Sequence, residues 1–255
     1  MNKSFTVIGN WKMHKTAREA VDFLEILMPQ VRGCQVNIFI AAPCLLIGSA
    51  VQGVKNSSVR IGAQNMHEER EGAFTGEVSG VMLKEAGASF VILGHSERRE
   101  LFGETDERIE KKVHRALGCD LTPVLCVGES LEAREAGKTE EVLQKQLHSS
   151  LRHLPQEAFK NLMIAYEPLW AIGVGLSARG DVAQEAHAWI RKCLERLCGK
   201  MAASLPILYG GSVKKENAKE LSSQRDIDGL LVGGASLEAS SFVSIINQLN
   251  WQKKT

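Results

Sequence analysis

Eight short apolar segments alternate with helix-like segments along the whole chain, and this alternation is the strongest constraint on the fold. Most of them lack an apolar–polar alternation, which is typical of strands covered on both faces in a parallel sheet. With no linker or low-complexity break between them, they favour a closed barrel over an open, doubly wound sheet. The predicted strands are residues 5–9, 36–42, 59–63, 90–94, 121–127, 162–166, 206–209 and 229–232.

A doubly wound sheet is the alternative architecture. It would usually carry a glycine-rich nucleotide-binding motif after its first strand, and residues 9–12 do not form one. We therefore predict an α/β protein with a single closed (β/α)8 barrel, one domain over residues 1–255. Barrels of this type commonly reach this length as one domain.

Composition excludes several classes of function. The formal net charge is +1, so we expect no nucleic-acid and no membrane partner. No apolar segment approaches the ~18 residues that span a bilayer, and the first residues do not resemble a signal peptide. The six cysteines form no Cys-x-x-Cys pair, which favours mostly buried, reduced thiols in a cytoplasmic protein. No His-Glu-x-x-His motif or Cys/His cluster is present, so we expect no metal.

Local signals place the helix boundaries. Thr16 with Glu19 forms a capping box, and Pro29 is the expected stop of that helix. A further helix over 130–152 is predicted to break at Gly137. Asp181, with Gln184 three residues later, is expected to open another. Four further helices are predicted. One ends near residue 87, two run over 105–118 and 214–221, and the last follows residue 236.

Polar and ionisable residues gather where the predicted strands end. In a barrel of parallel strands these ends share one rim, which is where active sites lie. The amino ends of the strands show nothing comparable, so we expect the functional site at the carboxyl rim. The residues at these ends are Asn10, Lys12, Gln64, Asn65, His95, Glu97, Glu129, Glu167, Ser212 and the glycine pairs 210–211 and 233–234.

Glu167 and His95 are the candidate proton-transfer groups. Glu167 follows a buried strand and precedes Pro168, under a segment that ends in Gly173 and Gly175; this pattern suits a general base under a mobile lid. A neutral imidazole such as His95 can donate one hydrogen bond and accept another, which suits proton traffic at a substrate oxygen. A solvated surface glutamate and a structural, capping histidine are the alternative interpretations.

Two glycine pairs after consecutive strands, 210–211 and 233–234, indicate a phosphate site built from backbone N–H groups; two tight turns are the alternative. Residues 173–178 also match the dinucleotide pattern Gly-x-Gly-x-x-Ala. Pro168 and its neighbours separate them from the strand, and no acidic strand end follows at the required distance, so a lid is the better interpretation. Glu97 and Glu129 could be catalytic, but the better interpretation is that they are partners of Lys12 or of that lid.

Taken together, these motifs resemble the triosephosphate isomerase family, and the resemblance covers essentially the whole chain. They are Asn10-Trp11-Lys12, Gln64-Asn65, the segments 72–77 and 94–99, Ala165-Tyr166-Glu167-Pro168, and the segments 209–213 and 228–237.

The resemblance implies a reaction and a set of roles. The reaction is interconversion of dihydroxyacetone phosphate and glyceraldehyde 3-phosphate through an enediolate, without cofactor. Glu167 would be the base, His95 the neutral electrophile, and Lys12 the positive charge near the enediolate and phosphate. The resemblance also implies a homodimer in which the loop 66–78, through Thr75, reaches the partner's site. Substrate-binding groups are implied at Asn10, Gly173, Ser212, Gly233 and Gly234.

The lid departs from the family pattern. The family commonly has Gly-Thr-Gly-Lys-Thr-Ala here. In this chain Val174 stands for the first threonine, Leu176 for the lysine and Ser177 for the second threonine. We expect activity, with an altered rate of lid opening. A catalytically inactive barrel that binds a phosphorylated metabolite, as sensor or scaffold, is the alternative. A Schiff-base aldolase is a further one, but it would need a strand lysine, and the predicted strands contain none.

Overall fold

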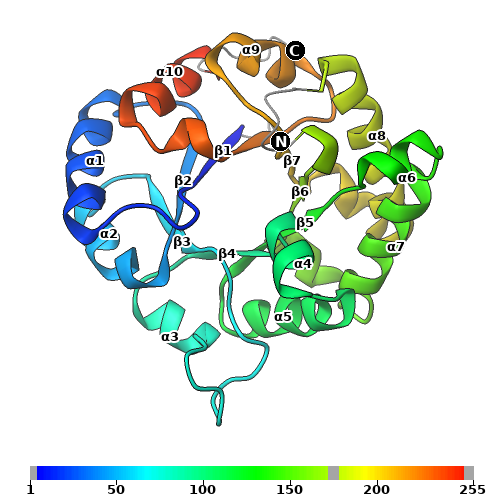
Figure 1. The fold of residues 1–255 in the computed structure, drawn as a ribbon, viewed down its shortest axis with the longest axis horizontal. Helices are drawn as coiled ribbons and strands as arrows, with labels where there is room; N and C mark the ends of the chain where they lie inside the picture. The colour runs from blue at the N-terminus through cyan, green and yellow to red at the C-terminus, as the bar shows by residue number, and fades with distance from the viewer. Residues whose placement is uncertain (1–4, 172–177, 250–255) are drawn as a thin grey trace.

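The computed structural model, which describes residues 5–171 and 178–249, is a closed barrel of eight parallel strands in sequence order. Figure 1 shows the strands at the centre and the helices in a ring around them. The predicted (β/α)8 architecture is therefore confirmed. The strands are β1 (Thr6–Asn10), β2 (Asn37–Ala42), β3 (Arg60–Ala63), β4 (Phe90–Leu93), β5 (Thr122–Val127), β6 (Met163–Tyr166), β7 (Ile207–Tyr209) and β8 (Gly229–Val232).

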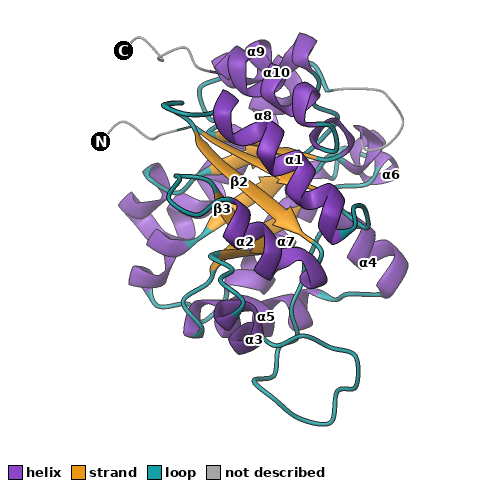
Figure 2. Cartoon of the chain, turned by 90° about the vertical axis from the view of Figure 1, so that its left-hand side faces the viewer, coloured by secondary structure: helices purple, strands orange, loops and turns teal. Residues whose placement is uncertain are grey.

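The helices enclose the barrel on all sides, as Figure 2 shows for the face over β2 and β3. Within the described residues, none is both long and apolar enough to cross a bilayer. The α-helices are α1 (Ala17–Gln30), α2 (Ile47–Gly53), α3 (Gly80–Glu85), α4 (Ser96–Phe102), α5 (Asp106–Gly118), α6 (Leu131–Glu135), α7 (Thr139–Leu151), α8 (Gly180–Cys198), α9 (Lys215–Ser223) and α10 (Ala239–Leu249). Short 3-10 turns are η1 (Cys44–Leu46), η2 (Gln156–Asn161), η3 (Leu169–Ala171), η4 (Gly199–Ala203) and η5 (Gly234–Ser236).

Strand side chains divide between two cores because successive residues point to opposite faces of a sheet. In β4, Phe90 and Ile92 belong to the smaller cluster that fills the barrel, whereas Val91 and Leu93 belong to the larger one beneath the helices. All four are buried. This double burial explains why the strands appear in the sequence as continuous apolar runs.

Helix capping follows the sequence signals with two corrections. The Thr16–Glu19 capping box is formed, and the chain breaks between α6 and α7 at Gly137, whose φ is +68°. Pro29 is not the stop: it lies inside the last turn of α1, which ends at Gln30. The helix continues past it because later amides still bond back, as the Val31 N–H does to the Leu27 carbonyl at 3.2 Å. Asp181 is not the cap of α8 either; that helix begins at Gly180 after Arg179, so Asp181 lies in its first turn.

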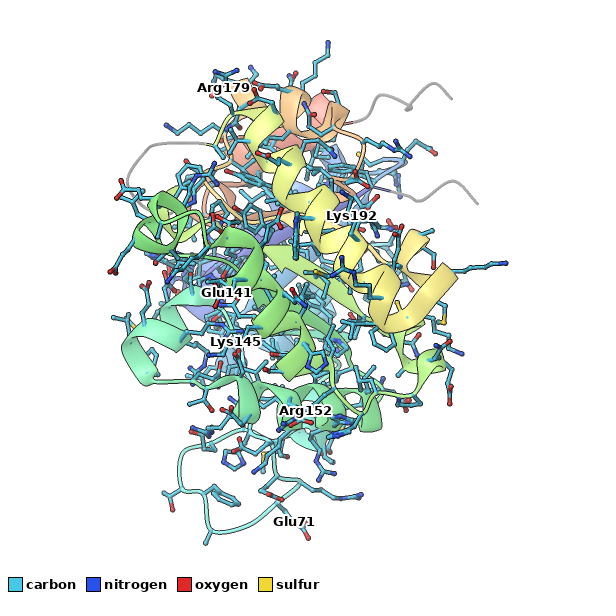
Figure 3. All side chains as sticks on the ribbon, turned by 90° about the vertical axis from the view of Figure 1, so that its right-hand side faces the viewer. Glu71, Glu141, Lys145, Arg152, Arg179 and Lys192 are labelled. Carbon is cyan, nitrogen blue, oxygen red and sulfur yellow. The ribbon has the colours of Figure 1, made fainter. Side chains whose placement is uncertain are left out.

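A long loop after β3 projects from the barrel. Figure 2 shows it extending beyond α3 and α5, and Figure 3 shows Glu71 on it, well away from the charged side chains on the outer surfaces of α7 and α8. Its base is closed by a hydrogen bond from the His67 N–H to the Val78 carbonyl, 2.8 Å. The loop carries exposed side chains, including those of Phe74 and Thr75, on this projection.

Candidate active site

One pocket of about 430 Å³ collects most of the residues predicted at the strand ends. Because all eight strands are parallel, their carboxyl ends meet at one rim, and the pocket lies there. Gly173 and the lid residues Val174, Leu176 and Ser177 lie outside the described residues. The predicted residues that line the pocket are Asn10, Lys12, His95, Glu167, Ser212, Gly233 and Gly234.

Glu167 is a buried carboxylate held at the end of β6, with 2% of its surface exposed. One carboxylate oxygen accepts a hydrogen bond of 2.9 Å from the Ser96 N–H, and the other lies 3.2 Å from His95 Nε2. Its own N–H donates to the Val127 carbonyl at 2.8 Å, which continues the β5–β6 ladder past the strand end. The carboxylate is thus fixed from both sides, so Glu167 is not a solvated surface glutamate.

His95 is the N-cap of α4, and this position determines its tautomer. Its Nδ1 accepts a hydrogen bond of 3.2 Å from the Glu97 N–H, so the Nδ1 lone pair is occupied. In the neutral ring the proton must then sit on Nε2, which points to Glu167. The capping role and the proposed electrophile role are therefore compatible, because the cap uses Nδ1 and directs Nε2–H toward the Glu167 carboxylate in the pocket.

Lys12 and Asn10 come from the end of β1. The Asn10 side-chain carbonyl accepts from the Lys12 N–H at 3.1 Å, and Gln64 donates to the Lys12 carbonyl at 2.9 Å. The Lys12 ammonium pairs with Glu97, as expected from the sequence. The positive charge is therefore already balanced in the structure, by a carboxylate whose side chain is 43% exposed.

The two glycine pairs differ in what requires them. A Cβ on Gly210 would lie 2.9 Å from Glu167 Cγ, and one on Gly211 would lie 2.2 Å from the Tyr209 hydroxyl, so close packing explains this pair. A Cβ on Gly233 would lie 3.4 Å from Lys12 Cε, whereas one on Gly234 would meet nothing within 4 Å. The second pair therefore borders open space beside a lysine, as an anion site requires.

Glu129 anchors the start of the predicted lid. It is fully buried, and one of its oxygens accepts from the Tyr166 hydroxyl at 3.0 Å and from Trp170 Nε1 at 2.9 Å. Burial and the neighbouring Glu129 charge raise the pKa of Tyr166 far above its usual value, so this hydroxyl stays a donor. At the last residue of the predicted lid, the Ala178 N–H donates to the Tyr209 hydroxyl at 3.2 Å.

Three groups at the site were not assigned a role from the sequence. The Ser96 N–H is a backbone donor and carries no residue-type signal. A Cβ on Gly128 would lie 1.8 Å from the Glu167 carbonyl oxygen, so only glycine fits there. Cys126 lies in the barrel core near Glu167, and its burial raises the pKa of its thiol. Gly128 directly follows a predicted strand, which is a visible sequence signal. Glycines in ordinary turns give the same signal, so the sequence alone does not indicate the close packing at Gly128.

Comparison with known proteins identifies the family. The family model for triosephosphate isomerase matches residues 5–249. The chain belongs to the triosephosphate isomerase family. Among similar triosephosphate isomerases, that of Fusobacterium nucleatum is 50% identical over 97% of this chain and 100% of its own length. That of Citrifermentans bemidjiense is 51% identical over 94% and 96%, and that of Protochlamydia amoebophila 48% over 96% and 94%.

Triosephosphate isomerase membership fits the composition of the pocket. A base, an imidazole donor, a lysine and a glycine-bordered space face one cavity. Among residues 5–171 and 178–249, no group of three or more histidine, cysteine, aspartate or glutamate side chains is arranged to hold a metal ion.

Proposed function

We propose that this protein interconverts dihydroxyacetone phosphate and glyceraldehyde 3-phosphate through an enediolate. The observation that carries the proposal is the separation of 3.2 Å between a Glu167 oxygen and His95 Nε2, in a pocket that also holds Lys12 and Gly233. A base and a donor this close together can act on one substrate at the same time. The base reaches a carbon, and the donor reaches the carbonyl oxygen on the adjacent carbon.

The proton path follows from these positions. Glu167 takes a proton from the substrate carbon next to the carbonyl, and the electron pair moves onto the carbonyl oxygen. The His95 Nε2–H donates a hydrogen bond to that oxygen, and Lys12 stabilises the negative charge on the oxygen. His95 then gives this proton to the oxygen and takes one back from the hydroxyl on the neighbouring carbon, and Glu167 returns its proton to the former carbonyl carbon. Such a positioned base contributes about 10²–10⁴ in rate, and one preorganised donor about 10²–10³.

The phosphate group is proposed to lie against Gly233 and Gly234. Both line the pocket that also holds Lys12, and because glycine has no side chain, an anion can approach their backbone N–H groups. Ser212 lines the same pocket, but its N–H donates to the Ala171 carbonyl at 3.2 Å. Phosphate binding through the Ser212 N–H would therefore have to replace that bond. We also propose that the Gly173 N–H binds the phosphate.

We further propose a single-domain, cytoplasmic enzyme that acts as a homodimer. Large apolar side chains are exposed near the projecting loop: Met13 is 95% exposed, Phe102 66% and Phe74 43%. Met13, Phe102 and Gly76 also line one groove of about 500 Å³ beside the active site. A second copy would cover such surface, with Thr75 reaching its site. Sedimentation equilibrium tests this proposal, and a monomer at micromolar concentration would contradict it.

The reaction itself is tested by isomerisation of glyceraldehyde 3-phosphate, with and without chelator, by the unmodified protein and by Glu167→Asp. The shorter side chain retracts the carboxylate by about 1 Å, and we expect kcat to fall on the order of 10²-fold. His148→Gln, a change on the outer α7, is the control and should leave kcat unchanged. An unmodified protein that binds a phosphate-bearing analogue without turnover would instead support the sensor alternative.

A further inference from the structure

Lys15 connects two segments that border the substrate pocket from opposite ends of the chain. Its ammonium donates a hydrogen bond of 2.7 Å to the Leu237 carbonyl, across 222 positions of sequence. Lys15 follows Lys12 by three residues, and Leu237 follows Gly234 by three. The two segments leave neighbouring strands, because β1 pairs with β8.

The segment that carries Lys12 has an unusual backbone. Lys12 and Lys15 both have left-handed conformations, with φ of +51° and +76°. A left-handed conformation is unfavourable for a residue with a side chain. Residues 11–15 belong to no helix or strand, and the Trp11 N–H bond to the Ala41 carbonyl, 3.1 Å, continues the β1–β2 pairing as far as Trp11. Side-chain contacts must therefore hold the segment in shape.

Lys15 supplies such contacts on its inner side. Its ammonium lies 4.7 Å from the centre of the Phe23 ring and 5.4 Å from that of Trp11. Trp11 is fully buried and packs edge-on against Phe23 at 5.1 Å. A cation over an aromatic face is attracted by the electrons of the ring. The Lys15 ammonium thus joins α1, the buried Trp11 and the Leu237 carbonyl at one point.

A second tie lies on the other side of Lys12. The Ser236 hydroxyl donates to the Gly233 carbonyl at 2.7 Å and lies 3.4 Å from the Asn10 carbonyl. Lys12 is therefore flanked by two links to the segment 233–237, one at Asn10 and one at Lys15. Between them, Lys12 Cε lies 3.4 Å from where a Cβ on Gly233 would stand.

We propose that Lys15 is a positioning residue that holds the Lys12 ammonium against the phosphate-binding segment at Gly233 and Gly234. It acts through the Trp11 and Leu237 contacts and does not touch the substrate. This inference rests on the function proposed above for Lys12. Losing the link lets residues 11–15 relax, and Lys12 then no longer stands at a fixed distance from the bound phosphate.

The test compares Lys15→Met with Lys15→Arg. Methionine keeps an apolar stem but removes the charge and the donor, whereas arginine keeps both. Lys15→Met removes this charge-assisted hydrogen bond and releases the segment that carries Lys12, so we expect it to raise KM, and the Kd of inorganic phosphate measured by calorimetry, about tenfold. Lys15→Arg should recover phosphate binding to within about threefold of the unmodified protein. Exposed Lys55→Met is the matched control and should change neither value.

A double-mutant cycle separates positioning from a merely structural role. In a Lys12→Met background, adding Lys15→Met should change the phosphate Kd less than about twofold, because the group that Lys15 positions is gone. An equal loss in both backgrounds would overturn the inference. So would a Lys15→Met loss at about 0.05 M salt that vanishes at about 0.5 M, since it would reflect long-range attraction. If Lys15→Met does not fold, Lys15→Gln, which removes the charge and shortens the side chain by one bond, replaces it.

Failure of the inference and failure of the proposed function are distinguishable in the same experiment. If Lys12→Met keeps full isomerase activity, the role proposed for Lys12 is wrong and the inference falls with it. If Lys12→Met is inactive while Lys15→Met matches the unmodified protein in KM and phosphate Kd, only the inference is overturned.

Discussion

Replacing Gly128 with alanine should displace the proposed base from outside the pocket. The added Cβ would lie 1.8 Å from the Glu167 carbonyl oxygen and 2.6 Å from its carbonyl carbon. Ordinary contacts between such atoms need roughly 3.5 Å, so one of the two backbones must move by about 1.5 Å. The question is which backbone can move.

Gly128 is the less movable partner. Its N–H donates to the Gln146 side-chain oxygen at 2.8 Å, and its carbonyl accepts from the Gln146 amide at 3.1 Å. Retreat of Gly128 would break both bonds. A shift of Glu167 away from β5 would strain its N–H bond to the Val127 carbonyl, but Glu167 lies past the end of β6 and outside its regular pairing. A misplacement of about 1 Å can cost on the order of 10²-fold in rate, so we expect kcat to fall at least that far. Overpacking should also lower stability by about 1–3 kcal/mol.

The assay is steady-state isomerisation together with thermal unfolding of the same preparations. Gly48→Ala is the matched control: it adds the same methyl group at an exposed helical position where nothing lies within 4 Å. That variant should keep full activity and gain about 0.5–1 kcal/mol. A Gly128→Ala protein with kcat within threefold of the original would refute the reasoning, because the displacement of Glu167 would then not have occurred.

Two predictions concern stability. Burial lowers the pKa of His187 to about 4 in the folded state, while the unfolded chain takes up that proton near 6.5; stability should therefore fall by about 3 kcal/mol between pH 6.5 and 4. In His187→Gln, the free energy of unfolding measured with urea should fall less steeply as the pH drops over this range. An equal dependence on pH in both proteins would contradict the assignment. Thr16→Ala removes the capping box of α1 and should cost about 1 kcal/mol, whereas Thr16→Ser should not; an unchanged unfolding midpoint in Thr16→Ala would mean that the cap contributes nothing.

The strands were predictable because burial on both faces leaves continuous apolar runs, but α2 was not. Its sequence, Ile-Gly-Ser-Ala-Val-Gln-Gly, contains two glycines and has little helical preference. The structure explains it by packing: a Cβ on Gly53 would lie 2.9 Å from Leu24 Cδ1, so the small residue lets α2 approach α1 closely. Tertiary contact of this kind overrides local propensity and leaves no periodic signal.

The site shows the same division between residue type and environment. Glu167, His95 and Lys12 were predictable because strand ends share a rim, so ionisable groups at those ends must meet. What fixes them was not predictable, because the Ser96 N–H and the Val127 carbonyl are backbone groups that any residue supplies. Lys15 was not predictable for a different reason. Its ammonium contacts two aromatic rings and the Leu237 carbonyl, but nothing in the sequence distinguishes it from the other members of a set of 31 basic residues. Sequence patterns therefore locate the proposed reacting groups, whereas the geometry that positions them resides in contacts that only the folded chain brings together.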